Sequence, residues 1–192
     1  MYVRGAKNRE EVWLLDRLDE LGLHDPAFRS RDYVIALDEE TGERAGFGRY
    51  RVHRDGDVCE FAAIGVLEDW REQGVGAHVL ERLVELASDQ GFERAFAFTG
   101  EGGYLTQFGF EPVAEAELAD VLADRLAEVR AHEDPDAVPM VLAFEDFEFP
   151  RRLRERFKRA GDDHEPSEPE ESPEDFGIDP DEATYKYDTG SG

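Results

Sequence analysis

Hydrophobic positions along residues 1–145 repeat with two periods, which predict a mixture of helices and strands. Apolar residues recur every three or four positions over residues 8–23, 74–90 and 117–130, as on one face of a helix. Short apolar runs bounded by turn residues predict strands over residues 2–4, 33–37, 45–53, 58–66, 92–99, 110–113 and 138–144. A short helix is expected over residues 104–108. This mixed order of elements predicts an α/β (α+β) fold.

The strand predicted over Val58–Val66 is apolar on both faces, so we expect it at the centre of a sheet. Asp55-Gly56, just before it, predicts a hairpin turn. The first helix is expected to start at an Asn8 cap and to bury a stripe of Val12, Leu15, Leu18 and Leu21. The second helix should end at Gly91 and bury Val75, Val79, Leu83 and Leu86.

The net charge of the chain limits the kinds of molecule that it is expected to bind. Its 192 residues carry a formal net charge of −25, from 47 acidic and 22 basic residues. Such a charge opposes nucleic-acid binding, which needs a basic surface. It is typical of proteins that self-repulsion keeps soluble in high salt, so we expect a halophilic source and stability that rises with salt.

Composition divides the chain into three parts. Residues 1–148 hold the periodic elements and are predicted to form one domain. Residues 149–160 predict a basic amphipathic helix, which we expect to pair with the chain's own acidic surface or tail. Residues 161–192 are strongly acidic and rich in proline. We expect them to be a disordered tail, because they cannot bury enough apolar surface to become ordered.

The number and spacing of the cysteine and histidine residues, and the lengths of the apolar runs, argue against several classes of protein. Cys59 is the single cysteine, so no intrachain disulfide can form, and its apolar surroundings predict a buried, inert thiol. An apolar run of about 18 residues and an N-terminal signal core are both absent, so we expect a cytoplasmic protein that does not bind membranes. The five histidines lack metal-ligand spacing, and no metal site is predicted.

The most specific motif follows the predicted central strand, where a polar loop leads from Val66 into a helical pattern with Gly74 and Gly76. Glycines let the backbone approach a ligand closely, because no Cβ intervenes. The free N–H groups of a first helical turn suit a phosphate or pyrophosphate. The spacing from Val66 to Arg71, Gly74 and Gly76 resembles the acetyl-CoA signature of the GNAT N-acetyltransferase superfamily.

This resemblance implies a GNAT fold, in which helices flank a mixed, mostly antiparallel central sheet and the central strands splay after Val66 at the acetyl-CoA site. It implies an acetyl-CoA-dependent N-acetyltransferase that acts on a primary amine, in a family whose members often form homodimers. The cofactor-binding residues that it implies are Ile64, Gly65, Val66, Arg71, Glu72, Gln73, Gly74, Val75, Gly76 and Ala77.

The resemblance also implies a general base at Glu60, near the start of the central strand. Alternation along the strand is expected to place on one face Glu60, Ala62, Ile64 and Val66. Burial is expected to raise the pKa of Glu60 towards that of a base that works at neutral pH. The alternative is a structural role, in which Glu60 faces solvent or pairs with Arg49 or Arg51 on the preceding strand.

The general acid of many family members is a Tyr in the pattern Y-x-x-x-G-F. Here Leu105 stands at that position before Gly109 and Phe110, and Tyr104 is one residue away. We therefore expect Tyr104 to be a core or surface aromatic residue. An adjusted register, and a thiolate that leaves without a dedicated acid, stay open as alternatives.

The stretches 59–66 and 109–113 resemble the acetyltransferase domain of N-acetylglutamate synthases. This resemblance implies an amino-acid acceptor such as glutamate, and the candidate ligands for its carboxylates are Arg49, Arg51 and Arg94. Two other functions stay open. One is a protein acetyltransferase that acts on N-termini or lysines, and the other is a non-catalytic, acetyl-CoA-binding regulator.

Overall fold

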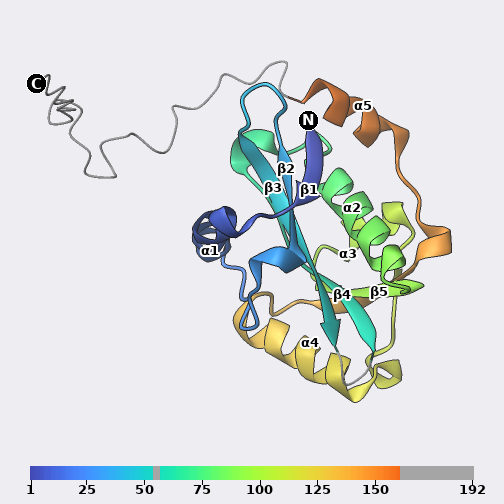
Figure 1. Cartoon of the computed structure of the whole chain (residues 1–192). Helices are drawn as coiled ribbons and strands as arrows, with labels where there is room; N and C mark the ends of the chain where they lie inside the picture. The colour runs from blue at the N-terminus through green and yellow to red at the C-terminus, as the bar shows by residue number, and fades with distance from the viewer. Residues whose placement is uncertain (54–56, 161–192) are drawn as a thin grey trace, which may run out of the picture.

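The computed structural model describes residues 1–53 and 57–160 and arranges them around a seven-stranded sheet (Figure 1). The strand order is β1-β2-β3-β4-β5-β7-β6, and all neighbours pair antiparallel except β4 and β5, which are parallel. The strands are β1 Tyr2–Gly5, β2 Tyr33–Leu37, β3 Arg44–His53, β4 Val58–Val66, β5 Arg94–Thr99, β6 Glu111–Pro112 and β7 Val138–Ala143. The α-helices are α1 Glu11–Glu20, α2 Val75–Asp89, α3 Gly102–Leu105, α4 Asp120–His132 and α5 Arg151–Arg159. Short 3-10 helices are η1 Asn8–Glu10, η2 Ser30–Asp32, η3 Glu68–Trp70, η4 Thr106–Phe108, η5 Glu115–Glu117 and η6 Phe144–Asp146.

This arrangement confirms the predicted fold class, a mixed and mostly antiparallel sheet flanked by helices. β4 is the fourth of seven strands, as its two apolar faces predicted. β2 and β4 have the predicted bounds, and the basic helix expected within residues 149–160 is α5. The predicted turn at Asp55-Gly56 and the predicted tail at residues 161–192 lie outside the described residues.

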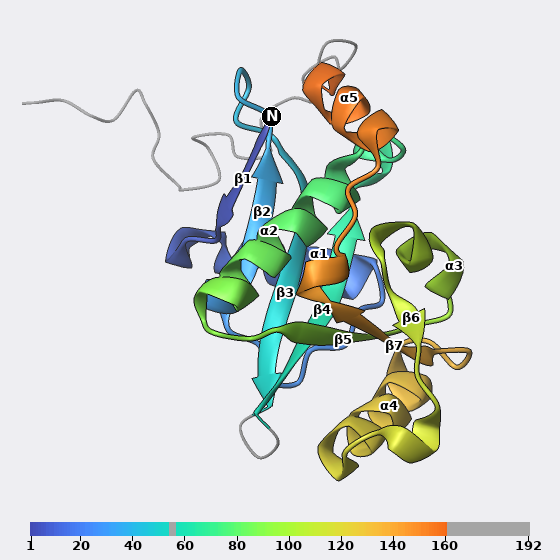
Figure 2. The ribbon, with the colours of Figure 1, turned by 90° about the vertical axis from the view of Figure 1, so that its right-hand side faces the viewer.

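Helices cover both faces of the sheet, and the views of Figure 1 and Figure 2 show the layers. α2 lies across β2, β3 and β4, where Val79 and Leu83 are buried in the larger apolar core. α1 packs on the opposite face, where Leu14 and Phe47 are fully buried. α4 lies beside the end of β3, and α5 lies against the N-terminal end of α2 (Figure 1).

α1 buries a different face from the predicted one. Leu18 is buried as expected, but Val12 and Leu15 are 70% and 45% exposed, and their places in the core are taken by Trp13 and Leu14. The predicted stripe assumed one regular helix from residue 8. Instead, the tighter 3-10 turn η1 precedes α1 and changes the rotation at which the helix meets the sheet.

The start of this segment is capped by Lys7, not by the predicted Asn8. The carboxylate of Glu10 accepts a hydrogen bond of 2.7 Å from the backbone N–H of Lys7. It also accepts two from Arg4 in β1, at 2.7 and 2.8 Å. Glu10 is 1% exposed, so these contacts form a buried link between α1 and the first strand.

Candidate functional site

β4 and β5 separate early along their length. They pair only at Cys59 with Ala95 and at Glu60 with Phe96, although β4 continues to Val66. Beyond Glu60, the backbone groups on this edge of β4 therefore have no β5 partner and can bind a ligand. The expectation that the strands splay after Val66 is corrected, because the pairing already ends at Glu60.

A β-bulge in β4 changes which side chains share a face. Opposite Gly48 the register between β3 and β4 shifts by one residue, and Ala63 has a φ of +49°. A bulge inserts one residue and so interrupts the alternation of side chains. Glu60 therefore faces the α1 side of the sheet, whereas Ile64 and Val66 face α2. The expectation that one face carries all of these side chains is wrong for this reason.

The predicted loop leads from Val66 into α2 and is held in place by a buried anchor. Trp70, in η3, is 1% exposed. Gly74 has a φ of +78°, a conformation that side chains rarely adopt, and α2 begins at Val75. The first N–H groups of α2 lack acceptors within the helix, so they are free to bind an anion.

Two adjoining cavities, each of about 480 Å³, lie along the seam between this loop and α5. Of the predicted cofactor-binding residues, those that line the inner cavity are Val66, Arg71, Glu72, Gly74, Val75 and Gly76. The outer cavity shares Arg71 and Glu72 with the inner one and adds Gln73. Ile64, Gly65 and Ala77 line neither cavity. Their backbone groups lie in β4 and in the first turn of α2.

Residues that sequence reasoning had not assigned to the site also line the inner cavity. Arg152, Leu153 and Arg156 of α5 form one wall. The approach of α5 is so close that a Cβ on Gly74 would overlap the carbonyl oxygen of Leu153. The basic composition of α5 was the available signal, but only the fold places this helix over the loop.

Tyr104 is 46% exposed, as expected of a surface aromatic residue, and it also lines the inner cavity. Its hydroxyl lies 3.6 Å from the position that a Cβ on Gly76 would take. Burial raises the pKa of Tyr104, which keeps its hydroxyl protonated. Leu105 is buried instead.

Glu60 is 1% exposed and both of its carboxylate oxygens have partners. Arg125 donates from Nε to Oε1 at 3.0 Å, and Nε2 of His53 lies 2.7 Å from Oε2. Burial raises the pKa of Glu60, but the hydrogen bond with His53 and the charge of Arg125 outweigh burial, so the pKa is lowered. The expected rise in pKa is therefore wrong. The structural alternative is also corrected in its details, because Glu60 does not face solvent and pairs with Arg125 and His53, not with Arg49 or Arg51.

Arg125 comes from α4 and was not predicted to reach the central strand. It forms ion pairs with Glu60, Glu128 and Glu133, at 3.0, 2.9 and 3.0 Å. A signal was present in the sequence, because Arg125 interrupts the apolar stripe that faces the core, formed by Leu122, Leu126 and Val129. A buried arginine in such a stripe needs a carboxylate partner.

The three arginines considered for an acidic acceptor have different surroundings. Arg49 is 3% exposed and bound to Asp25, to Asp32 at 3.2 Å and to the carbonyl of Ala27 at 2.9 Å, so it anchors a loop. Arg94 is exposed and lies over the ring of Phe96.

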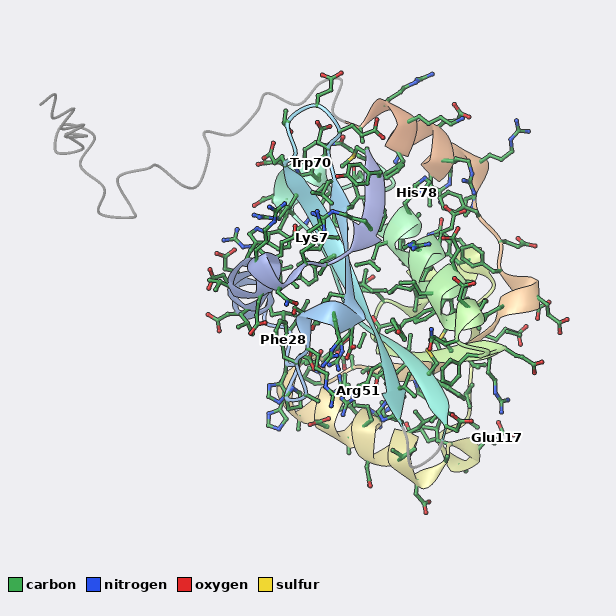
Figure 3. All side chains as sticks on the ribbon, in the orientation of Figure 1. Lys7, Phe28, Arg51, Trp70, His78 and Glu117 are labelled. Carbon is green, nitrogen blue, oxygen red and sulfur yellow. The ribbon has the colours of Figure 1, made fainter. Side chains whose placement is uncertain are left out.

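Arg51 is the cross-strand neighbour of Glu60. Its Nη1 is buried without a hydrogen-bond partner among the described residues. Figure 3 labels Arg51 at the end of β3 that approaches α4. Nε of Arg49 is also buried without a partner within the described ranges, so Arg51 is a half-buried arginine with a hydrogen bond left to donate beside Glu60.

Three further observations concern the described part of the chain. Cys59 is buried, as expected, and burial raises the pKa of its thiol to about 12. None of the helices in residues 1–53 and 57–160 is both long and apolar enough to cross a membrane. Within the same ranges, no three His, Cys, Asp or Glu side chains are grouped so that they could hold a metal ion.

Comparisons with known proteins support this picture of the fold. The sequence pattern of the acetyltransferase (GNAT) family matches residues 4–110. The chain is similar to N-acetylglutamate synthase from Neisseria gonorrhoeae in complex with coenzyme A and N-acetyl-glutamate (TM-score 0.60, 21% identity), over 74% of this chain and 34% of that one. It therefore spans about a third of the length of that protein. No curated protein matches the chain in sequence.

Two further solved structures have similar coverage of this chain. Rv2747 from Mycobacterium tuberculosis, in complex with CoA, has a TM-score of 0.59 and 18% identity over 74% of this chain and 99% of that one. A GNAT-family acetyltransferase from Staphylococcus aureus Mu50 has a TM-score of 0.53 and 9% identity over 74% and 98%. At these sequence identities, the structural likeness shows a shared fold and nothing further.

Proposed function

Because the chain belongs to the acetyltransferase (GNAT) family, we propose that it transfers an acetyl group from acetyl-CoA to a primary amine. The observation that carries this proposal is the inner cavity, where the loop before α2, Arg71 and the half-buried Val66 at the end of β4 meet. The free N–H groups of α2 and the guanidinium of Arg71 are the donors that a pyrophosphate needs. Gly76 also lines this cavity, and its lack of a side chain lets a ligand approach the backbone there.

The length of β4 supports an extended ligand. Val66 lines the inner cavity and lies six positions after Glu60 along the strand, a distance of about 20 Å. A ligand with phosphates at one end and its reactive group at the other would span this distance along the unpaired edge of β4. When bound, acetyl-CoA supplies the acetyl group as a thioester at the end of the pantetheine arm.

In this proposal the backbone groups of Ile64, Gly65 and Val66 bind the arm and the acetyl carbonyl. A backbone N–H directed at a developing oxyanion contributes about 3 kcal/mol to catalysis. Glu60 accepts the proton of the attacking amine as general base. The thiolate leaves without a dedicated acid and takes its proton from solvent, because Tyr104 lines the inner cavity together with the phosphate donors.

The acceptor that we propose is an amino acid with a side-chain carboxylate, such as glutamate. Arg51 supports this choice, because its buried Nη1 has no partner within the described residues and lies on the strand next to Glu60. An acceptor carboxylate at Arg51 would place the amine near Glu60. The similar N-acetylglutamate synthase from Neisseria gonorrhoeae is described as a complex with N-acetyl-glutamate.

One observation favours a second candidate function, a non-catalytic regulator that binds acetyl-CoA. Both oxygens of Glu60 are engaged by Arg125 and His53, and its pKa is lowered, so it is a weak base in this state. A protein acetyltransferase would use the same donor site with a peptide as acceptor.

Release of CoA thiol from acetyl-CoA tests the proposal, with pooled amino acids, polyamines or basic peptides as acceptors in about 2 M KCl, the salt chosen for the charge of the chain. We expect release that depends on the amino-acid pool, with glutamate as the active member. Release with peptides alone would identify a protein acetyltransferase. A rise in melting temperature with acetyl-CoA but no release would favour the regulator, and the absence of both would contradict acetyl-CoA binding.

A further inference from the structure

α5 concentrates positive charge in a chain that is otherwise strongly acidic. Six of its nine residues are Arg or Lys, and one is Glu. The whole chain has only 22 basic residues and a net charge of −25. A cationic segment of this density would pair with carboxylates if its role were only to hold the fold together, so the partners of its individual side chains are informative.

The apolar side of α5 fixes its position over α2. Leu153 and Phe157 are 5% and 7% exposed, and the ring of Phe157 stacks on His78 of α2 at 3.7 Å between ring centroids. Arg154 contributes to this packing, because it forms an ion pair with Glu81 of α2 at 2.7 Å. Figure 3 labels His78 beneath α5. The remaining arginines are therefore held in a defined place beside the loop.

Three arginines converge on the inner cavity from two elements: Arg71 from the loop, and Arg152 and Arg156 from α5. Arg152 donates to the side chain of Gln107, and Arg156 donates to the carbonyl of Glu72 at 3.1 Å. Within residues 1–53 and 57–160, no carboxylate forms an ion pair with any of the three, in contrast to Arg154 and Lys158 of the same helix.

Three arginines and one carboxylate residue, Glu72, line the inner cavity, so it has a net positive charge and also receives the first turn of α2. The outer cavity is less suited to an anion, because the carboxylates of Asp69 and Glu155 line it as well. A guanidinium binds phosphate oxygens through two parallel hydrogen bonds, which gives both strength and orientation.

We infer that α5 is the second wall of the phosphate site, where Arg152 and Arg156 bind the pyrophosphate of CoA opposite the first turn of α2. This inference rests on the proposed function and extends it to residues beyond the part of the chain that matches the family, residues 4–110. It assigns to α5 a binding role, whereas the sequence suggested only that this helix pairs with acidic surface.

Isothermal titration of CoA into the full chain tests the inference without any need for activity. We compare Arg152→Ala/Arg156→Ala with Arg151→Ala/Lys158→Ala, a control that removes the same charge from the same helix but changes no residue of the inner cavity. All proteins are measured in one buffer, because salt screens these contacts. We expect the first variant to weaken the Kd by about tenfold or more, and the control to stay within about twofold.

A second ligand and a second variant keep the result specific. Titration of 3′-dephospho-CoA should show the same loss, because this ligand keeps the pyrophosphate; a loss confined to CoA would overturn the assignment. Tighter binding by Arg152→Ala/Arg156→Ala would also overturn it, since α5 would then obstruct the loop.

If that variant fails to fold, Arg152→Lys/Arg156→Lys replaces it and should weaken binding by severalfold, since the charge remains and the paired hydrogen bonds are lost. Equal binding by this variant and the wild type would contradict the inference, whereas no binding of CoA by the wild type would contradict the proposed function itself.

Discussion

The carboxylate of Glu60 has two demands placed on it, one by the fold and one by the proposed chemistry. It joins β4 to α4 through Arg125 and to β3 through His53, and it is 1% exposed. As the proposed base, it has to accept a proton from an amine. A single substitution affects both roles, so stability and turnover have to be measured separately.

Glu60→Gln keeps the size of the side chain and removes its charge. We expect the free energy of unfolding to fall by about 1–3 kcal/mol, because buried hydrogen bonds to Arg125 and His53 are weakened. If Glu60 is the base, turnover of the folded variant should fall by about 100-fold or more. Chemical denaturation and thiol release measure the two effects.

Glu10→Gln is the matched control for this prediction. Glu10 is also 1% exposed and bound by arginine, and like Glu60 it lines neither cavity, but it joins η1 to β1 and has no part in the proposed chemistry. It should lose a similar amount of stability and keep its turnover within about twofold. Full turnover in Glu60→Gln would contradict the assignment of the base.

Glu10 also predicts how stability depends on pH. Burial raises its pKa, but the hydrogen bonds from Arg4 and from the backbone of Lys7 outweigh burial and lower it. The ionised form is therefore favoured by folding, so its contribution to stability is present above the ordinary pKa of about 4.3. That contribution is lost as the pH falls through the lowered pKa.

The difference in free energy of unfolding between wild type and Glu10→Gln should therefore be largest near pH 7 and shrink below about pH 4.3. Urea denaturation of both proteins at four pH values between 7 and 3, at one salt concentration, measures it. Because only the difference is used, the titration of the other carboxylates largely cancels. A difference that stays constant across this range would contradict the argument.

Among the elements, α5 sets a steric requirement on the loop that it covers. Gly74 has a positive φ and also lies against the carbonyl of Leu153, whereas Gly91 has a similar φ of +89° with no atom within 4 Å of a Cβ. Gly91→Ala therefore measures the conformational cost alone, about 1 kcal/mol. Gly74→Ala should cost about 2 kcal/mol or more, since α5 has to move.

Thermal and urea denaturation of the two variants compare these costs. Equal losses for Gly74→Ala and Gly91→Ala would show that α5 does not press on the loop. Because Gly74 also lines the inner cavity, the titration with CoA should show weaker binding for Gly74→Ala and unchanged binding for Gly91→Ala.

The bounds of elements were predictable where apolar runs end in turn residues, as for β2 and β4. The bulge at Ala63 was not predictable, because an inserted residue leaves no mark on an apolar run that is buried on both faces. The bulge places the side chains of Ile64 and Val66 on the α2 face of the sheet, opposite to the face of Glu60. The predicted loop residues do line the cavities, because their spacing is local in sequence. The contacts of Arg125, Arg152 and Arg156 join segments distant in sequence, and spacing alone cannot reveal them.

On the scale of the whole molecule, a net charge of −25 means that like charges repel one another over most of the surface. Salt screens this repulsion, with a Debye length of about 10 Å at 0.1 M and about 3 Å at 1 M. We therefore expect the Tm to rise by several degrees between 0.1 M and 2 M KCl. Differential scanning calorimetry at constant pH measures the change, and a Tm that is flat or falls over this range would contradict the argument.

The position of β7 has a consequence for how the protein is made. Within residues 1–53 and 57–160, β7 is the last strand in sequence but lies between β5 and β6 in the sheet, and β6 pairs with β7 alone. On the ribosome, β5 and β6 emerge before the strand that joins them. Until Ala143 has emerged, β5 is an open sheet edge, and open edges are templates for pairing with other chains. We therefore expect the yield of folded protein to depend on how quickly translation passes from residue 99 to residue 143.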